Sequence, residues 1–446
     1  MPHLIFIGDD FTLKLTKKEA IKYDLIFELI NYKNHAHFNQ VCEKMLHDSI
    51  FVVFGESNLD FKNLNSKVIQ VTSNNNRCIL ESRIDYFFKK HIVEYKIIDI
   101  SDLSTCTSAI YPQFRTINFT LTKNFANLFV LILLTIKGYR NSERKVNSPA
   151  NTLFEIFNKL LTPAYFLKTY VIDRLVIKYF SKKYDWNVQI KNTNNNQLLN
   201  LTSCKNYFYA DPFVFQSSNK IKIIYEKFLK DEKYGTIELA DINYSNNIIE
   251  SRKVVINDGI HRSYPFVIEH FGNIFLIPES KRKQTLEIYK WCPTVENFKF
   301  LKSVLDGKLI VDPTIYKDER SNFWLFTNES LSTSGDSGSH LFIYKIDSPE
   351  MNEIQSHSKN PVIVDCRIAR SAGNFFIHSD KVIRPSQYCD GSIYGKEINY
   401  IEITELTLDD FNFNLISYDS FSNGIKIKNQ HHHRSFLNEY IASDYI

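Results

Sequence analysis

The feature of this sequence that most constrains its fold is an internal repeat, which recurs about every 50–60 residues from position 209 onward. Each copy opens with a short apolar strand, followed by a polar turn and a second strand that ends in a polar residue. The opening strands are Tyr209–Phe215, Arg262–Ile268, Val311–Tyr316 and Arg370–Phe376. A period of this length, holding about four short strands, is typical of the blades of a β-propeller.

The two ends of the repeat region supply strands for a further blade. One β segment lies at residues 186–190, and another is expected in the stretch after Phe411. Pairing the two ends in one sheet would close the ring and leave no free edge. The sequence therefore predicts a mainly β protein with a five-bladed β-propeller over residues 184–446.

Residues 1–115 carry a different pattern, which predicts a smaller α/β domain. Leu4–Ile7, Ile50–Phe54 and Val68–Val71 are short apolar runs of the kind that form buried strands. Between the first two, Thr16–Glu19 has the form of a capping box, with Ile21, Leu25 and Leu29 following at helical spacing. Strand, helix and strand in this order indicate an α/β fold.

Residues 116–183 are expected to form a helical, basic linker region. Between residues 137 and 183, ten Lys or Arg stand against three Asp or Glu. Arg174, Lys178 and Lys182 recur at four-residue steps and form one basic stripe. Through residues 164–183 such a helix could make a peripheral contact with an anionic membrane. The alternative is a linker helix whose basic face is solvated.

The composition indicates which cellular compartment and which binding partners to expect. A hydrophobic content of 43% and a charged content of 23% are ordinary for a globular protein. No nucleic-acid-binding motif accompanies the small net charge of +4, so no nucleic acid is expected. The seven cysteines form no CxxC pair, which predicts no metal site, and no cofactor is predicted. With no signal-peptide pattern, a cytoplasmic location is expected, including the inner membrane surface.

The repeats place carboxylates at the mouth of the central channel. The first strand of each blade lines the channel, so two Asp-Pro pairs bring Asp211 and Asp312 to its mouth. The second strand returns to the same face and is expected to carry Glu226, Glu279 and Glu329 there. Two carboxylates across a pocket are what glycosidic chemistry requires. The alternative is structural: Asp before Pro can cap a turn, and repeated Glu or Gln residues can clasp neighbouring blades.

These positions define the candidate site. The catalytic candidates are Asp211, Asp312 and Glu279. The candidates for substrate binding are Glu226, His261, Arg262, Tyr264, Asn328, Arg370, Asn374, Arg384 and Gln387. The three arginines suggest an anionic ligand, because guanidinium groups match phosphate and carboxylate. The expected partners are a sugar, a nucleotide sugar or a glycolipid.

The opening of the first copy resembles a known enzyme family. Tyr209–Pro212 is similar to the Ala-Asp-Pro opening of glycoside hydrolase family 43, whose members are five-bladed propellers. The resemblance implies that Asp211 is a general base and that Asp312 occupies the place of the family's general acid. This sequence departs from the family in carrying Asp rather than Glu at 312, and in lacking a pKa-tuning Asp beside Tyr264.

A closer resemblance covers the propeller from Trp186 to Phe411. The chain is similar there to the N-terminal domain of plant glucosamine inositolphosphorylceramide transferases. That domain also occurs in bacterial proteins of surface-polysaccharide loci, where it can follow a formyltransferase-like domain. The motifs are Tyr209–Phe215, His261–Ile268, Ile277–Glu279, Asp312–Tyr316, Leu325–Asn328, Ile368–Phe376 and Ile383–Gln387. Residues 1–115 resemble a degenerate form of the formyltransferase-like domain.

Together these observations predict a carbohydrate-active protein of cell-surface glycan or glycolipid biosynthesis. Its sugar, anionic or phosphorylated, would bind at the propeller mouth, with glycosyl transfer or hydrolysis by paired carboxylates. The alternative is a non-catalytic glycan-binding or scaffolding propeller.

Overall fold

The computed structural model describes residues 3–43, 49–55, 67–73, 92–100, 104–112, 117–141, 185–243, 248–333, 335–389, 398–416, 435–437 and 439–445. The chain divides into two compact units, and the main boundary falls between Ser181 and Lys182. The first unit is a small α/β region, and the second is a five-bladed propeller.

The α/β unit is built on one six-stranded sheet with the order β2-β1-β3-β4-β5-β6. The strands from β2 to β4 pair in parallel, and β5 and β6 add antiparallel. The bounds are β1 Leu4–Gly8, β2 Phe27–Asn31, β3 Ile50–Phe54, β4 Lys67–Ser73, β5 Ile92–Asp99 and β6 Ser104–Pro112. The three predicted strands are thus confirmed, and their unbroken apolar runs suit a parallel sheet buried on both faces.

The first helix begins earlier than the sequence pattern indicated. Helix α1 runs from Asp10 to Lys22, and Asp9 is its N-cap, accepting hydrogen bonds from the backbone N–H groups of Phe11 and Thr12. The predicted capping box at Thr16–Glu19 therefore lies inside the helix, and that prediction was wrong. Leu29 belongs to strand β2. A second helix, α2, spans His35–Glu43.

Helix α4, Ile117–Ile136, packs on this sheet. The ring centroids of Phe129 and Phe6 lie 5.6 Å apart, and those of Phe125 and Phe54 lie 5.8 Å apart. The start of the expected linker region is thus a helix of the α/β unit. Among the described residues, no helix is long and apolar enough to cross a membrane. The basic stripe of Arg174, Lys178 and Lys182 lies outside the described residues.

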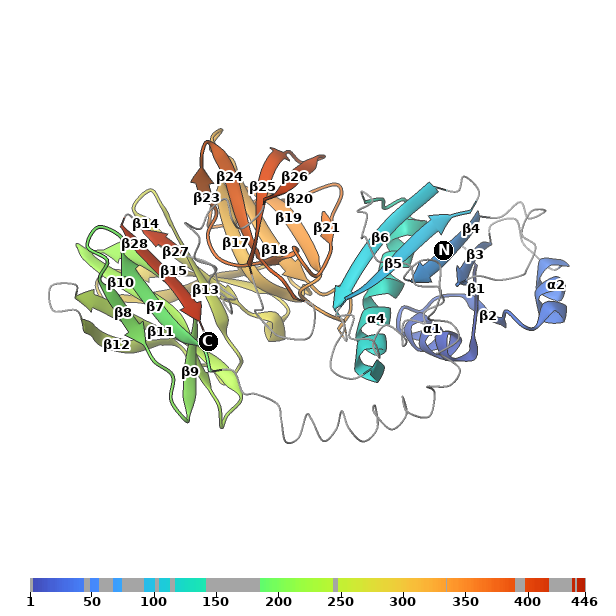
Figure 1. Cartoon of the computed structure of the whole chain (residues 1–446), viewed down its shortest axis with the longest axis horizontal. Helices are drawn as coiled ribbons and strands as arrows, with labels where there is room; N and C mark the ends of the chain where they lie inside the picture. Colours follow the sequence, from blue (N-terminus) through green and yellow to red (C-terminus); the bar gives the residue numbers. More distant parts are fainter. Residues whose placement is uncertain are drawn as a thin grey trace, which may run out of the picture. The chain divides into compact units, whose positions relative to one another are not determined.

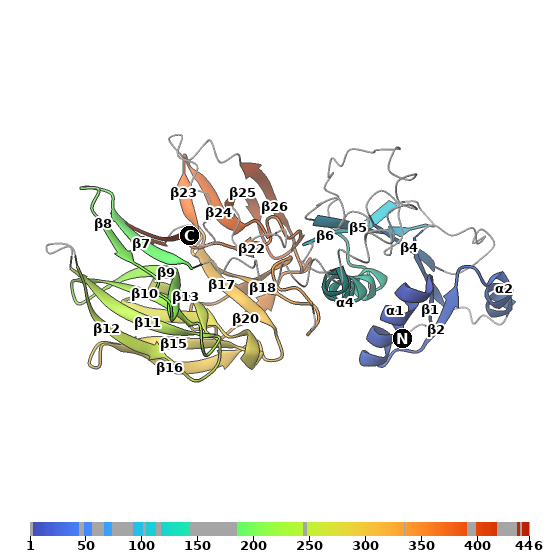
Figure 2. The ribbon, with the colours of Figure 1, turned by 60° about the horizontal axis from the view of Figure 1, so that its bottom comes forward.

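The propeller unit consists of five sheets (Figures 1 and 2). Blade one consists of β9 Tyr207–Ser217, β10 Lys220–Leu229, β11 Tyr234–Asn243 and β12 Ile248–Ile256. Blade two consists of β13 Ser263–His270, β14 Asn273–Glu279, β15 Leu286–Cys292 and β16 Asn297–Val304. Blade three is β17 Ile310–Lys317, β18 Phe323–Glu329, β19 His340–Ile346 and β20 Ile354–Ser356, with β21 Ile363–Val364 beside β19. Blade four is β22 Arg370–Ser371, β24 Lys381–Gln387, β25 Ile398–Leu406 and β26 Phe411–Ile416, with β23 Phe376–His378 beside β24.

The fifth blade joins the two ends of the propeller. Its order is β27-β28-β7-β8, with β27 at Ser435–Leu437, β28 at Tyr440–Tyr445, β7 at Asn187–Asn192 and β8 at Leu198–Leu201. Strand β28 pairs antiparallel with β7, and Figure 1 shows the red C-terminal strands beside green β7. Closure by both ends is as predicted. The stretch directly after Phe411, however, is the outer strand of blade four, and the C-terminal strands of blade five come later.

Two buried hydrogen bonds fasten blade five to blade one. The backbone N–H of Val214 donates to Ser435 Oγ at 3.0 Å, and that of Asp211 donates to Asp444 Oδ2 at 3.1 Å. Asp444 is fully buried. Because a buried N–H without an acceptor is costly, these contacts contribute to closing the ring.

Replacing Asp444 with Ala should therefore destabilise the protein by about 1–3 kcal/mol, because the Asp211 N–H loses its acceptor. Asp444→Asn, which keeps an acceptor oxygen, should lose less. Urea unfolding of the full chain measures both, with exposed Asp409→Ala as the control. Equal losses for Ala and Asn would contradict this account of the closure.

Candidate functional site

A bulge at the same place in three inner strands shapes the mouth. In β9, β13 and β17 the residue before proline has a positive φ: 50° at Asp211, 44° at Tyr264 and 48° at Asp312. The strand register shifts at each of these points. Non-glycine residues rarely adopt this conformation, and such strain gathers at functional sites. At these bulges the three side chains reach the neighbouring blades: Asp211 contacts Tyr264, Tyr264 contacts Gly373, and Asp312 contacts Arg370.

Asp211 links three blades. Its backbone N–H donates to Asp444 of blade five, and its Oδ2 accepts the backbone N–H of Tyr264 in blade two at 3.1 Å. Its carboxyl group is also hydrogen-bonded to that of Glu226 in the adjacent strand β10. Asp211 is thus both a clasp between blades and half of a carboxyl pair.

Tyr264 and Asp312 extend these contacts to blades three and four. The Tyr264 hydroxyl shares a 3.0 Å hydrogen bond with Thr314 Oγ1 and accepts the Gly373 N–H at 2.8 Å. Asp312 pairs with Arg370 of blade four, whose Nε–H donates to Asp312 Oδ2. Burial, together with the nearby Asp312 charge, raises the pKa of Tyr264, so this residue remains a neutral phenol.

The second strands bring a polar residue to one position, opposite the start of each inner strand. Glu226 pairs with Ala210, Glu279 with Ser263, and Asn328 with Val311. The blade-three member is therefore Asn328, not Glu329. Neighbouring residues of a strand face opposite sides.

Glu329 instead bonds within its own blade. Its Oε1 accepts the Tyr344 hydroxyl at 2.6 Å and the Thr327 hydroxyl at 2.9 Å, and Lys308 lies 3.2 Å from Oε2. The expected placement of Glu329 with Glu226 and Glu279 was wrong.

Polar residues on the second strands fall into two kinds. Asn328 is a clasp: its Oδ1 accepts the Ser371 N–H at 3.0 Å, and its Nδ2 donates to the carbonyl of Ala369 at 2.9 Å. Asp444, on the second strand of blade five, clasps Asp211 in the same way. The side chain of Glu279 makes no hydrogen bond within the described part of the chain. The Glu226 side chain is hydrogen-bonded to the Asp211 carboxyl group. Asn328 thus has a structural role, whereas the two glutamates are not tied to the next blade's backbone.

Burial and mutual repulsion keep these glutamates protonated. Burial raises the pKa of Glu279 to about 8, with Asp312 adding to the rise and Arg370 opposing it. Burial also raises the pKa of Glu226 well above its usual range, reinforced by Asp211 and Glu279. Carboxyl groups from several blades therefore lie close together, and the raised pKa values of Glu226 and Glu279 favour their protonated forms.

The three arginines expected to bind the ligand lie in different settings. Arg262 is fully buried and contacts Asp258 at 2.7 Å and Glu287 at 2.6 Å. Arg384, also buried, donates to the carbonyls of Ile368 and Ala369. Only Arg370, through its pair with Asp312, lies among the mouth carboxylates.

The remaining candidates lie on blades four and two. Gln387 Nε2 donates to the Ser371 carbonyl at 2.9 Å and so braces the inner strand of blade four. Asn374 Oδ1 is buried without a hydrogen-bond partner in the described structure. His261 precedes β13 and accepts the Gly235 N–H at Nδ1.

Sequence reasoning missed Asp444 as a member of this cluster. Its strand, Tyr440–Tyr445, carries an acidic residue in its second half, as β10 and β14 do, and that was the available signal. No group of three or more His, Cys, Asp or Glu residues suited to a metal ion occurs among the described residues.

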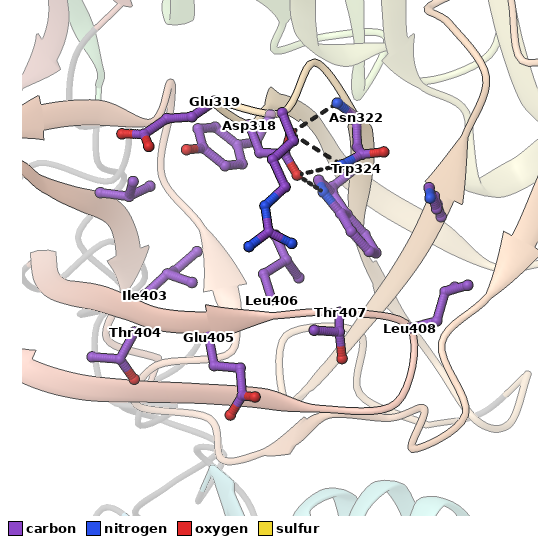
Figure 3. A pocket seen from close by; sticks show the side chains of 14 residues that line it. Asp318, Glu319, Asn322, Trp324, Ile403, Thr404, Glu405, Leu406, Thr407 and Leu408 are labelled. Atoms are coloured by element: carbon purple, nitrogen blue, oxygen red, sulfur yellow. Dashed lines mark hydrogen bonds between the residues drawn. The ribbon is translucent and has the colours of Figure 1, made fainter.

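A pocket of about 540 Å³ lies away from the mouth, between blades three and four (Figure 3). Its walls include the turn that follows β17 and the end of β25, whereas Asp312 stands near the start of β17. Trp324 Nε1–H and the Asn322 side chain donate to Asp318. Burial opposes ionisation of Asp318, but these hydrogen bonds hold its pKa below the usual value. Asp318 is therefore a structural anion of this pocket.

Comparison with known proteins identifies the family. Residues 186–435 match the family described as glucosamine inositolphosphorylceramide transferase 1, N-terminal. The chain belongs to this family. The match covers blades one to four and strands β7 and β8 of blade five, and it excludes the α/β unit.

Two curated relatives that bear this name align with only part of the chain. The chain is 25% identical over 206 residues to glucosamine inositolphosphorylceramide transferase 1 of Oryza sativa subsp. japonica, covering 46% of the chain and 27% of the relative. It is 27% identical over 206 residues to that of Arabidopsis thaliana, covering 46% of the chain and 26% of the relative. The chain thus spans about a quarter of the length of the curated relatives it matches.

Solved glycoside hydrolase structures are more distant. A GH43 enzyme from Xanthomonas citri aligns with a TM-score of 0.38 and 10% identity, over 54% of this chain and 88% of that one. The β-xylosidase/α-arabinofuranosidase CoXyl43 from a compost microbial metagenome aligns with a TM-score of 0.37 and 14% identity, over 53% and 84%. These similarities carry no argument about chemistry.

The buried carboxyl cluster makes stability depend on pH. The pKa of Glu279 is about 8 in the folded protein and about 4.5 when exposed. Its contribution to stability should be complete below the unfolded pKa and fall as pH rises through about 8. Glu279→Gln should flatten the decline in unfolding free energy measured by urea titration between about pH 5 and about pH 9. An unchanged slope would show that Glu279 is not held protonated.

Proposed function

We propose that this protein is a carbohydrate-active protein of cell-surface glycan or glycolipid biosynthesis, which binds a sugar at the propeller mouth and acts on it by paired carboxylates. Family membership supports the sugar-related role. The observation that carries the mechanism is Glu279, a buried carboxyl group with a pKa of about 8 that is electrostatically coupled to Asp312 and Asp211.

Glu279 is the proton donor in this mechanism. A carboxylic acid that stays protonated near neutral pH can give its proton to the oxygen that leaves the anomeric carbon. Asp211 takes the proton of the incoming hydroxyl group, from an acceptor sugar or from water. One C–O bond forms and one breaks, and the proton lost by Glu279 is balanced by the one gained by Asp211.

Asp312 and Arg370 position the ligand beside that acid. Their ion pair places a guanidinium group among the carboxylates, and a guanidinium group matches the oxygens of an anionic ligand. This supports an anionic, phosphorylated or nucleotide-linked sugar as ligand. Arg262 and Arg384 contribute less to that proposal, since both side chains are fully buried and bind protein carboxylates or carbonyls.

Single substitutions test the mechanism. Asp211→Asn and Glu279→Gln should each lower turnover of sugar nucleotides or glycan substrates about 100-fold or more, because each removes a proton-transfer group. Binding, measured by calorimetry, should change much less. Glu329→Gln, a buried glutamate on the other face of β18, is the matched control. Turnover that survives both substitutions would refute the carboxylate mechanism, and binding without turnover would favour the non-catalytic glycan-binding alternative.

The pH profile tests the acid directly. Activity should fall as pH rises through about 8, because Glu279 then loses the proton it must donate. The fall should be absent from the residual activity of Glu279→Gln. A wild-type rate that stays level to about pH 10 would assign the acid elsewhere.

We also propose that residues 164–183 rest on the cytoplasmic surface of the inner membrane, where a glycolipid substrate would be presented. The basic stripe in the sequence supports this contact. Neutralising Arg174, Lys178 and Lys182 together should reduce sedimentation with anionic vesicles, while neutral vesicles serve as the control. Unchanged sedimentation would exclude the contact.

A further inference from the structure

A basic turn follows Glu279 at the rim of the mouth. The residues Lys281–Lys283 form a short 3-10 turn directly after β14. Lys283 is engaged by Asp258 at 3.1 Å and Glu287 at 2.9 Å, and Lys281 donates to Ser337 Oγ. Arg282 is exposed and makes no hydrogen bond or ion pair in the described structure. It is therefore a cation of this turn whose donors remain available.

The neighbouring His261 has a fixed tautomer. Its Nδ1 accepts the backbone N–H of Gly235 at 2.8 Å, so in the neutral ring the proton is on Nε2. Burial, with the charges of Arg282 and Arg370, lowers the pKa of His261 to about 4, against an opposing effect of Asp312. The ring is about one third exposed, and near neutral pH it presents an N–H donor rather than an acceptor.

Gly235 makes this arrangement possible. A Cβ at this position would lie 2.5 Å from the Arg262 carbonyl oxygen and 2.9 Å from Glu226 Cδ. Both distances are far below van der Waals contact. Any side chain here would displace Glu226, the backbone before β13, or both, and with them the His261 ring. The donor to His261 Nδ1 is the backbone N–H of Gly235, and a donor on a side chain would not lie in the same place.

We propose that His261 Nε2–H and the Arg282 guanidinium form an anion subsite at the rim of the propeller mouth, which takes the phosphate or carboxylate oxygens of the sugar ligand. The inference rests on the proposed function and names the residues that select a charged sugar. Ser263 pairs with Glu279, and Lys283 lies 3.1 Å from Asp258, so the segment that carries His261 and the turn that carries Arg282 are adjacent. Two donors placed there match an oxygen that only accepts. The other charges near the His261 ring are Arg370, Asp312 and Glu226, whose Oε1 lies 3.8 Å from Nδ1. Burial raises the pKa of Glu226 well above its usual range, reinforced by Asp211, which weakens its repulsion of an anion.

Two matched ligand pairs test the subsite: glucose with glucose 1-phosphate, and glucose with glucuronate. Wild-type protein should bind each charged sugar at least about tenfold more tightly than glucose, as expected for charge-assisted hydrogen bonds. Arg282→Ala and His261→Asn should remove that preference, because each should weaken binding of the charged sugars far more than binding of glucose. His261→Gln, whose amide N–H can stand in place of Nε2–H, should retain part of it. Arg320→Ala, an exposed arginine at the other end of blade three, is the control.

Imidazole ¹⁵N NMR gives a readout that does not require a sugar. The spectrum of the free protein should show the Nε2–H tautomer, and added inorganic phosphate should raise the His261 pKa in wild type but not in Arg282→Ala. Gly235→Ala should abolish the tautomer preference in protein that remains folded by circular dichroism.

The outcomes separate the two proposals. Retention of the charged-sugar preference in Arg282→Ala overturns the subsite and leaves the sugar site standing. A phosphate effect on His261 without binding of any sugar supports the subsite and counts against the proposed function. Absence of both the phosphate effect and the charged-sugar preference in wild type overturns the subsite outright.

Discussion

The propeller depends on the hydrogen bonds that run through Asp211 from blade five to blade two. Each blade is a separate sheet, so the ring needs polar contacts at the crowded centre, where backbone groups lack partners within their own sheet. The Asp444 carboxylate satisfies the Asp211 N–H, and the Asp211 carboxylate satisfies that of Tyr264. The positive φ at Asp211 and Tyr264 is tolerated because these contacts hold the bulges in place.

The same closure creates the chemistry of the site. Asp444 and Asp211 are charges that the ring needs, and they surround Glu226 in a buried setting. Burial, reinforced by Asp211 and Asp444, raises the pKa of Glu226, and burial, reinforced by Asp312, raises that of Glu279. The contacts that close the propeller therefore also shift the proton equilibrium of the glutamate beside them.

The sequence predicted most of the fold and part of the site, for physical reasons that can be traced to particular residues. The repeat spacing located the blades and the two Asp-Pro pairs, since both are local patterns, but it gave no sign of the bulges at those pairs. It could not separate Asn328 from Glu329, because a shift of one residue reverses the face of a strand. Nor could it show that protein groups bind the Arg262 and Arg384 side chains, or that Asp444 from the last strand joins Asp211. Those facts depend on contacts between residues far apart in the chain.

The fifth blade also imposes an order on how the protein comes into being. Its outer strands, β7 and β8, are made before every other strand of the propeller, and its inner strands, β27 and β28, are made last. A nascent chain can complete four blades on the ribosome while Asp211 still lacks the carboxylate of Asp444. A site at the mouth would then be complete only once β28 has been made, so a product that stopped before this strand would lack the carboxylate that binds the Asp211 N–H.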